Sequence, residues 1–300
     1  MQLTKAIDLF LGEHKPTTAK SYLQPLKSLR DWVGPARELS DISPELLIEY
    51  FQMLNKRGYA LATVQKHVIT VKTFFNWIVK IDKLEKSPAR VIRGRKLPRA
   101  ISRDKAMSDA ELSAIIDAVR YKPRDYALVM FLSDSGCRRG GAAGLRLQDI
   151  NWRERTAKVT EKGDKPRFVA FGEHCQVALV KWLAYRGSLN GSLTGVYIFS
   201  FDGTLMKPEN ISLIIRRAAA KAGVRVLSSH SLRHRKGHQY ADARIAPSIA
   251  ATALGHSDVL ITLNSYYPGD WESAKKTLHE LATDPSTLKD SPDNIVKFGR

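Results

Sequence analysis

Residues 83–105 constrain the fold of this chain more than any other stretch, because they combine dense positive charge with two prolines and a glycine. Nine of them are basic and two are acidic, and their apolar residues follow no sustained period. Such a stretch is typical of an extended connection and not of a helix or strand with a buried face. We therefore predict two folded units, a basic linker between them and a polar tail, with these bounds: 1–86, 107–270, 87–106 and 271–300.

The positive charge is distributed unevenly. The chain of 300 residues has a formal net charge of +18, and residues 51–106 alone carry 14 basic against 3 acidic side chains. An excess of this size makes an acidic polymer the expected partner. The linker is either a solvated hinge or a strap along nucleic-acid phosphates. We favour the strap, because runs of lysine and arginine gain affinity by releasing counterions.

Several features favour a location inside the cell. No stretch approaches the roughly 18 uncharged apolar residues of a membrane span. Asp8 and Glu13 interrupt the apolar residues at the N-terminus, where a signal peptide needs an uninterrupted apolar core. The two cysteines, Cys137 and Cys175, cannot by themselves form a disulfide framework or a four-ligand zinc site. We expect a cytoplasmic, nucleoid-associated protein that does not bind a membrane.

The first unit is predicted to be a bundle of four amphipathic helices. Apolar residues at helical spacing form one face between residues 22 and 33, and a second between 46 and 54. Ser43 and Pro44 are typical of a helix start. The exposed side of the fourth helix is either a solvated face or a DNA contact, and it offers these residues: Thr63, Lys66, His67, Thr70 and Lys72.

The second unit is predicted to mix helices with a small antiparallel hairpin. Ser108 and Glu111 have the spacing of a capping box, and Pro123 opens another helix. Two β-prone runs flank a Gly-Asp centre at 156–171, which indicates the hairpin. Further helices are expected at 173–186, 208–222, 232–243, 247–254 and 258–266. The predicted class is therefore mainly α, with a helical bundle followed by a unit that contains one small β-sheet.

The run HSLRHRKGH at 230–238 places three histidines at a spacing of four, which is compatible with zinc binding. We expect no metal site, because the cations among these histidines repel a dication and no acidic residue follows until Asp242. The same mixture suits a phosphate, since a guanidinium directs two donors at phosphate oxygens and an imidazole can donate or move a proton.

Five short motifs occur in a characteristic order. They are the turn before Arg138, the hairpin sequence EKGDK that contains Lys162, HSLRH from His230, LGHS that contains His256, and the pair at Tyr266. Together they resemble the tyrosine recombinase, or phage integrase, family. The resemblance covers nearly the whole chain, because that family also has an N-terminal helical core-binding domain of the SAM-like type and a basic linker.

The resemblance implies a catalytic role for each motif. Arg138 and Arg233 would clamp the nonbridging oxygens of a DNA phosphodiester, and His256 would donate a hydrogen bond to the same phosphate. Protein cations must stabilise the pentacoordinate transition state when no metal does so. No cofactor is expected.

The remaining roles concern bond making and proton transfer. Tyr266 would attack phosphorus and form a 3′-phosphotyrosyl link, which conserves the bond energy so that no ATP is needed. His230 would take the phenolic proton, and Lys162 would protonate the departing 5′-hydroxyl. Two alternatives stay open, Lys165 in place of Lys162 and Tyr267 in place of Tyr266. We prefer Lys162, which matches the family's Lys-Gly position.

Two departures from the family pattern affect these roles. The family often has a supporting glutamate three residues after the first arginine, where this chain has Gly141. Basic residues follow HSLRH where the family often has small or apolar ones. Apart from the six catalytic positions, we expect DNA contacts from these residues: Lys66, Lys72, Arg93, Arg95, Lys96, Arg99, Lys165 and Arg235.

The resemblance therefore implies a site-specific DNA recombinase, an integrase or resolvase of a mobile element. Its partners would be double-stranded DNA with specific core sites and, as in the family, three further copies in a tetramer on paired sites. An accessory DNA-bending protein is left open. The segment 272–282 would dock on a neighbouring protomer or cover its own core. The alternatives are a relaxing enzyme like type IB topoisomerases and a non-catalytic DNA-binding regulator.

Overall fold

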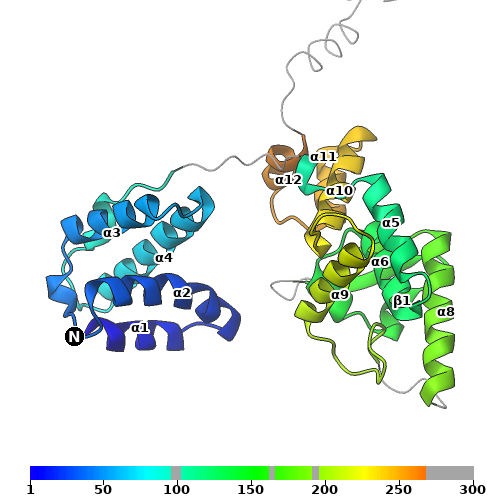
Figure 1. Cartoon of the computed structure of the whole chain (residues 1–300), viewed down its shortest axis with the longest axis horizontal. Coiled ribbons are helices and arrows are strands. Elements are labelled where there is room, and N and C mark those ends of the chain that lie inside the picture. The colour runs from blue at the N-terminus through cyan, green and yellow to red at the C-terminus, as the bar shows by residue number, and fades with distance from the viewer. Residues whose placement is uncertain (96–102, 162–165, 191–195, 268–300) are drawn as a thin grey trace, which may run out of the picture. The chain divides into compact units, whose positions relative to one another are not determined.

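The computed structural model of the chain describes residues 1–95, 103–161, 166–190 and 196–267 (Figure 1). The chain divides into two compact units, Met1–Pro98 and Arg99–Arg300. The segment 272–282 lies outside the described residues. So do four of the side chains to which the sequence assigned a role: Lys96, Arg99, Lys162 and Lys165.

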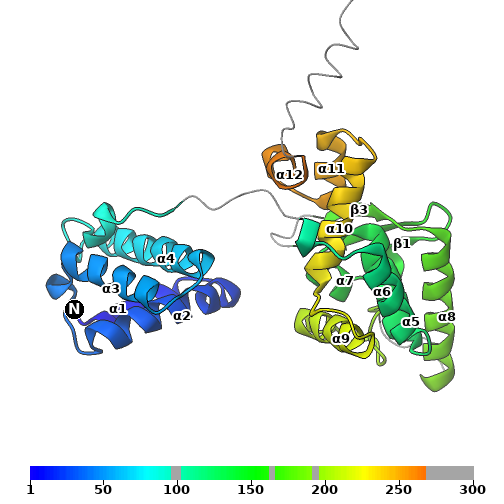
Figure 2. The same ribbon diagram turned by 45° about the horizontal axis from the view of Figure 1, so that its top comes forward.

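The first unit is a bundle of four helices, as predicted (Figures 1 and 2). A Ser-Pro start opens its third helix, where the Ser43 hydroxyl accepts a hydrogen bond from the Leu46 N–H at 3.2 Å and so satisfies one unpaired donor of the first turn. The elements of this unit are α1 (Leu3–Gly12), α2 (Pro16–Val33), α3 (Pro44–Lys56) and α4 (Leu61–Lys80), with the 3-10 helices η1 (Leu39–Asp41) and η2 (Pro88–Val91).

Helix α4 is packed on more than one side, because it contacts α1, α2, α3 and η2. Its apolar face is buried, as Val71 and Phe75 show. The expectation that His67 and Thr70 are exposed on its other side is wrong, because they are only 4% and 2% accessible. His67 instead shares a hydrogen bond of 2.7 Å with the Tyr50 hydroxyl, which satisfies both buried groups.

The first residues of the predicted linker belong to the first unit. Ala89 and Ile92 are buried in its core, against α3 and α4. Lys72, which the sequence assigned to DNA contact, donates to the Ile92 carbonyl at 3.0 Å and holds this segment on α4. The next basic residues, Arg93 and Arg95, are exposed.

The second unit contains a three-stranded antiparallel sheet in the order β1-β2-β3. Strand β2 (Thr156–Thr160) pairs with β3 (Pro166–Ala170) in the predicted hairpin, with Lys158 opposite Phe168. Strand β1 (Ile150–Asn151) is too short for a sequence pattern and was not predicted.

Helices pack on this sheet, as α7 contacts β2 and α6 contacts β3. Helix α6 lies at the centre of the unit, since it also contacts α5, α7, α8 and α10. The predicted capping box at the start of α5 is confirmed by reciprocal hydrogen bonds between Ser108 and Glu111. The helical elements are η3 (Arg103–Lys105), α5 (Asp109–Val119), α6 (Pro123–Ser135), α7 (Arg139–Ala143), η4 (Leu147–Asp149), α8 (Glu173–Asn190), α9 (Pro208–Lys221), α10 (Ser229–Asp242), α11 (Pro247–Leu254) and α12 (Val259–Tyr266).

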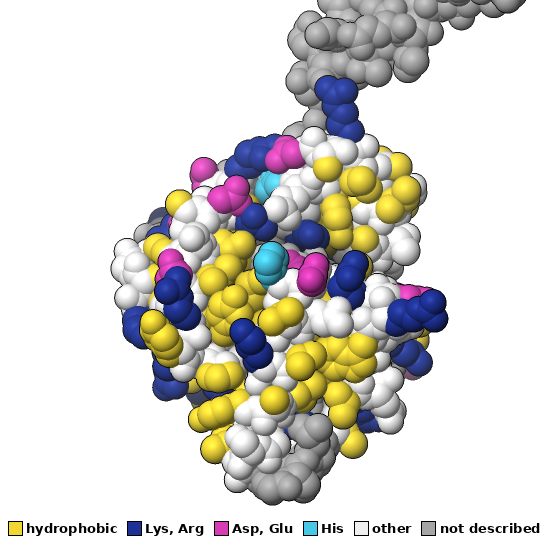
Figure 3. Space-filling model, turned by 90° about the vertical axis from the view of Figure 1, so that its right-hand side faces the viewer, with side chains coloured by type: hydrophobic (Ala, Val, Ile, Leu, Met, Phe, Trp, Pro, Cys, Tyr) yellow, Lys and Arg dark blue, Asp and Glu magenta, His cyan; other side chains and the backbone are white. Residues whose placement is uncertain are grey.

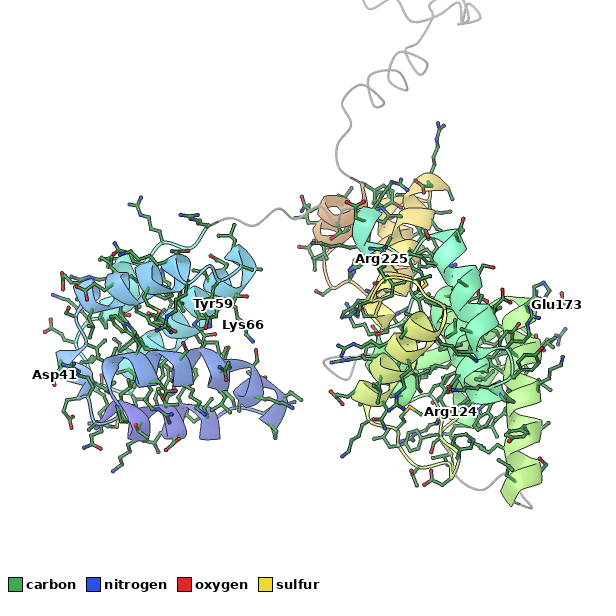
Figure 4. All side chains as sticks on the ribbon, in the orientation of Figure 1. Asp41, Tyr59, Lys66, Arg124, Glu173 and Arg225 are labelled. Carbon is green, nitrogen blue, oxygen red and sulfur yellow. The ribbon has the colours of Figure 1, made fainter. Side chains whose placement is uncertain are left out.

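The first described residues of this unit are joined to the rest of it by hydrogen bonds from Arg225. Arg225, labelled in Figure 4, donates to the carbonyl oxygens of Asp104 and Ala106 and to the carboxylate of Glu111. On the face shown in Figure 3, basic and acidic side chains lie among hydrophobic ones. Within the described ranges, no helix combines the length and the apolar character that crossing a bilayer requires.

Candidate active site

Three arginines from separate elements converge at the C-terminal end of α11. Unpaired carbonyls at such an end carry partial negative charge and attract cations. Gly255 ends the helix in the left-handed conformation, with φ +66°. Each guanidinium donates to one carbonyl there: Arg167 of β3 to Ala253, Arg233 of α10 to Leu254, and Arg138 before α7 to Gly255.

The local structure around Arg138 explains how it reaches this cluster. Gly136 ends α6 with φ +56°, a conformation that favours glycine, and the chain then turns into α7. Arg138 is the residue that precedes α7, in an extended conformation. Its side chain is 33% accessible, so this guanidinium can meet a ligand from solvent.

Arg233 is the buried member of the cluster, with 4% of its surface accessible. It donates to the Gly136 carbonyl at 2.9 Å and so joins α10 to the turn before Arg138. Burial and the neighbouring charge of Arg138 lower the pKa of Arg233 to about 10, which leaves it charged at neutral pH.

One carboxylate lies among these cations. Glu161, which directly follows β2, pairs with Arg138 and with Arg167, and its side chain is 5% accessible. The sequence assigned no role to Glu161 or Arg167, although both lie within the predicted hairpin at 156–171.

His256 follows the end of α11 and is held by α12. Its Nδ1 lies 2.6 Å from the hydroxyl of Thr262, a fully buried residue. A hydroxyl that donates to Nδ1 leaves the Nε2 hydrogen free to donate to a ligand. Burial, followed by the charge of Arg233, lowers the pKa of His256 to about 4, so the ring is neutral at pH 7 and acts as a hydrogen-bond donor.

Tyr266 is the last residue of α12 and lies next to His256. It is 4% accessible, and its ring lies parallel to that of His256, with centroids 6.3 Å apart. A Cβ atom on Gly237 of α10 would lie 2.4 Å from Cζ of Tyr266, so only glycine permits this approach. Burial raises the pKa of Tyr266, against the opposing effect of Arg233 and Arg138.

The hydroxyl of Tyr266 contacts His234, to which the sequence assigned no role. The distance to His234 Nδ1 is 3.1 Å. His230, the predicted base, lies in the first turn of α10, which begins at Ser229 and not at 232 as expected, and its ring centroid is 6.2 Å from that of His234. Partial burial and then the charge of Arg233 lower the pKa of His230. This shift favours the uncharged imidazole, which is the form that can accept a proton.

The competing tyrosine has a different environment. The hydroxyl of Tyr267 donates to the Ile245 carbonyl at 2.7 Å, between α10 and α11. This hydrogen bond engages Tyr267 away from the guanidinium groups.

The remaining predicted residues lie outside the cluster. Arg235 pairs with Asp109 of α5, and Lys66 projects from α4 as an exposed side chain (Figure 4). Cys137 is fully buried, and burial raises the pKa of its thiol to about 11. Over the parts of the chain with described side chains, no three His, Cys, Asp or Glu residues gather closely enough to hold a metal ion.

The lowered pKa values of two histidines predict how the stability of the fold depends on pH. His234 and His256 have pKa values of about 4 when folded, against about 6.5 in an unfolded chain. The unfolded state therefore binds more protons, and stability should be full above pH 6.5 and fall as the pH drops toward 4. Thermal melts at pH 7.5 and 5 should show a lower Tm at pH 5, with roughly 2–4 °C for each kcal/mol lost.

The double variant His234→Gln/His256→Gln should reduce this difference in Tm. The window above pH 5 lies above the titration of most carboxylates, which keeps their contribution small. A wild-type Tm that is unchanged or higher at pH 5 would contradict the assignment of these two rings as neutral.

Comparison with known families matches both units. The model of the family described as "Phage integrase family" matches residues 105–271. The model described as "Phage integrase, N-terminal SAM-like domain" matches residues 8–81. Similar curated proteins include one named tyrosine recombinase XerC from Corynebacterium glutamicum, 27% identical over 260 residues, which cover 85% of this chain and 82% of that protein. Another protein of that name, from Mycobacterium sp. strain JLS, is 28% identical over an alignment that covers 82% of this chain and 86% of that protein.

Solved structures show the same fold at lower identity. XerH site-specific recombinase bound to its difH substrate aligns with a TM-score of 0.70 and 22% identity, covering 89% of this chain and 80% of that one. The Tn1549 transposon integrase in complex with transposon right end DNA aligns with a TM-score of 0.74 and 16% identity, and the alignment covers 94% of this chain and 100% of that one. The mainly helical class with one small antiparallel sheet is thereby confirmed.

Proposed function

Because this chain belongs to the phage integrase family, we propose that it is a site-specific recombinase that cuts and rejoins DNA through a covalent tyrosine link. One observation supports this most strongly. A buried tyrosine, Tyr266, lies between a histidine of α10 and the neutral ring of His256, under the influence of Arg138 and Arg233. A phenol in the electrostatic field of two guanidinium groups is an arrangement that suits attack on a phosphodiester.

The first chemical step forms one bond and breaks one bond. The oxygen of Tyr266 bonds to phosphorus while the bond from phosphorus to the 5′-oxygen breaks, which leaves a 3′-phosphotyrosyl link and a 5′-hydroxyl end. Arg138 and Arg233 stabilise the charge that develops on the nonbridging oxygens, and His256 donates to one of them. Attack by another 5′-hydroxyl reverses the step on a new strand, and no ATP is consumed.

Two proton transfers accompany this step. The phenolic proton of Tyr266, whose pKa is raised by burial, must pass to a base. His234 contacts the hydroxyl in this structure, whereas the family pattern assigns this role to His230. The departing 5′-oxygen takes its proton from Lys162, or from Lys165.

The rest of the chain would hold the DNA. We assign the first unit to core-site binding and the basic residues of 87–106 to the phosphate backbone, where exposed Arg93 and Arg95 release counterions. A homotetramer on two paired sites, with segment 272–282 docked between protomers, completes the proposed assembly.

Covalent trapping tests the proposed function. The full chain is incubated in EDTA, without ATP, with nicked duplexes tiled across the DNA that flanks its gene. A nick beside the cleaved bond lets the 5′-hydroxyl fragment diffuse away, so the adduct accumulates as an SDS-resistant complex. We expect such an adduct on a duplex with inverted repeats.

The same preparation distinguishes the alternatives. Recombinant products between two labelled sites would agree with the proposal. Relaxation of plasmid DNA that lacks such a site, without recombinants, would indicate a topoisomerase-like enzyme. Tight binding without any adduct would indicate a regulator.

A further inference from the structure

The carboxylate of Glu161 makes more contacts than a surface ion pair. One oxygen accepts from the main-chain N–H of Arg138 at 2.6 Å and from Nη2 of Arg167 at 3.1 Å. The other accepts from Nη1 of Arg138. A carboxylate that binds the backbone and the side chain of one arginine fixes both ends of that side chain.

The space for Glu161 exists because residue 141 is glycine. A Cβ atom at Gly141, in α7, would lie 3.1 Å from Cγ of Glu161 and 3.3 Å from Cβ of Val159. Any side chain there would push against the glutamate. The sequence therefore has a glycine where the family often has a supporting glutamate, and a glutamate on the facing strand end fills the space.

We infer that Glu161 is the positioning residue for Arg138, and that Gly141 is the opening that lets a carboxylate from the hairpin take this place. The inference rests on the proposed function, because it concerns how the phosphate is bound. With Nη1 held by Glu161 and by the Gly255 carbonyl, the guanidinium plane has one orientation. Its Nε and Nη2 have no hydrogen-bond partner among the described residues, and they form the edge left for a phosphate.

Charge balance supports the same role. Three guanidinium groups lie together here, and like charges in a half-buried site repel one another. Among the described residues of this cluster, one carboxylate against three guanidinium groups leaves an excess of two positive charges. The pentacoordinate state formed from a phenolate and a phosphodiester carries two negative charges, so the excess matches the species to be stabilised.

Glu161 is ionised under the conditions of the reaction. Burial raises the pKa of its carboxyl, but the charge of Arg167 and the N–H of Arg138 outweigh burial, and the pKa stays below its ordinary value. A neutral glutamic acid would offer one acceptor fewer to Arg138.

The test measures binding and cleavage separately. Glu161→Ala should lower the single-turnover rate of adduct formation on the nicked duplex by ~10–100-fold, because Arg138 loses its orientation. The Kd for uncleaved DNA should change by less than the rate does. Glu154→Ala is the matched control, since Glu154 is an exposed carboxylate in the turn between β1 and β2 of the same sheet. This variant should cleave at the wild-type rate.

A double-mutant cycle shows whether Glu161 acts through Arg138. If it does, Glu161→Ala should cost little when Arg138 is already alanine, so the two losses are not additive. Additive losses would overturn the inference, because they would mean that Glu161 acts elsewhere or only supports the fold.

A swap of the two positions remains informative if Glu161→Ala folds poorly. In the double variant Gly141→Glu/Glu161→Gly, the carboxylate comes from α7 and fills the vacated space, and we expect it to cleave faster than Glu161→Gly alone. Equal rates for these two variants would overturn the inference. A wild-type protein that forms no adduct contradicts the proposed function and the inference together, whereas equal adduct formation by wild type and Glu161→Ala contradicts the inference alone.

Discussion

Tyr266→Phe is expected to abolish the SDS-resistant DNA adduct, whereas Tyr267→Phe should form it at close to the wild-type rate. The two tyrosines are adjacent, but only Tyr266 directs its hydroxyl at His234 and lies against His256. Phenylalanine retains the ring and its packing while it removes the attacking oxygen. The measurement is the time course of adduct formation on the nicked duplex.

Tyr267→Phe is the matched control because it removes the same atom one residue later. It loses the hydrogen bond to the Ile245 carbonyl, which is worth about 1 kcal/mol, or roughly 2–4 °C in Tm. Adduct formation by Tyr266→Phe, or its loss in Tyr267→Phe alone, would reverse the assignment.

Arg138→Ala should lower the cleavage rate by ~10²–10³-fold, because the guanidinium acts on charge that develops only in the transition state. Its side chain is partly accessible, so the variant should fold. DNA binding should change little, since one contact among many is lost. Single-turnover cleavage and fluorescence anisotropy over a range of salt concentrations measure the two properties.

The pair Arg93→Ala/Arg95→Ala should show the converse behaviour. Both residues are exposed, and their loss should weaken binding and reduce the slope of log K against log salt by about 0.9 for each phosphate contact removed. Cleavage should then fall only as far as binding falls. Equal loss of binding and cleavage in both variants would contradict a division between residues that grip DNA and residues that act on one phosphate.

The sequence predicted those parts of the site that have a local pattern. Arg138, Arg233, His256 and Tyr266 lie in short motifs, and the structure brings all four to one place. The helix caps at Ser43 and Ser108 were also predictable from the sequence, because capping depends on residues three positions apart.

The parts that were missed depend on contacts between distant segments. Arg167 reaches the Ala253 carbonyl 86 residues later, and Glu161 reaches Arg138 23 residues earlier. No periodicity records such pairs. His67 and Thr70 were placed wrongly for a related reason, because a helix pattern shows one apolar face but not that other elements cover a second face.

The C-terminal end of α11 positions all three guanidinium groups of the site. Three successive carbonyls there each receive one guanidinium, from β3, α10 and the start of α7. A shift of this one short helix would therefore displace all three cations in concert, and misplacement by about 1 Å is enough to cost ~10²-fold in rate. A change in the position of α11 should therefore affect all three guanidinium groups at once and not one of them alone.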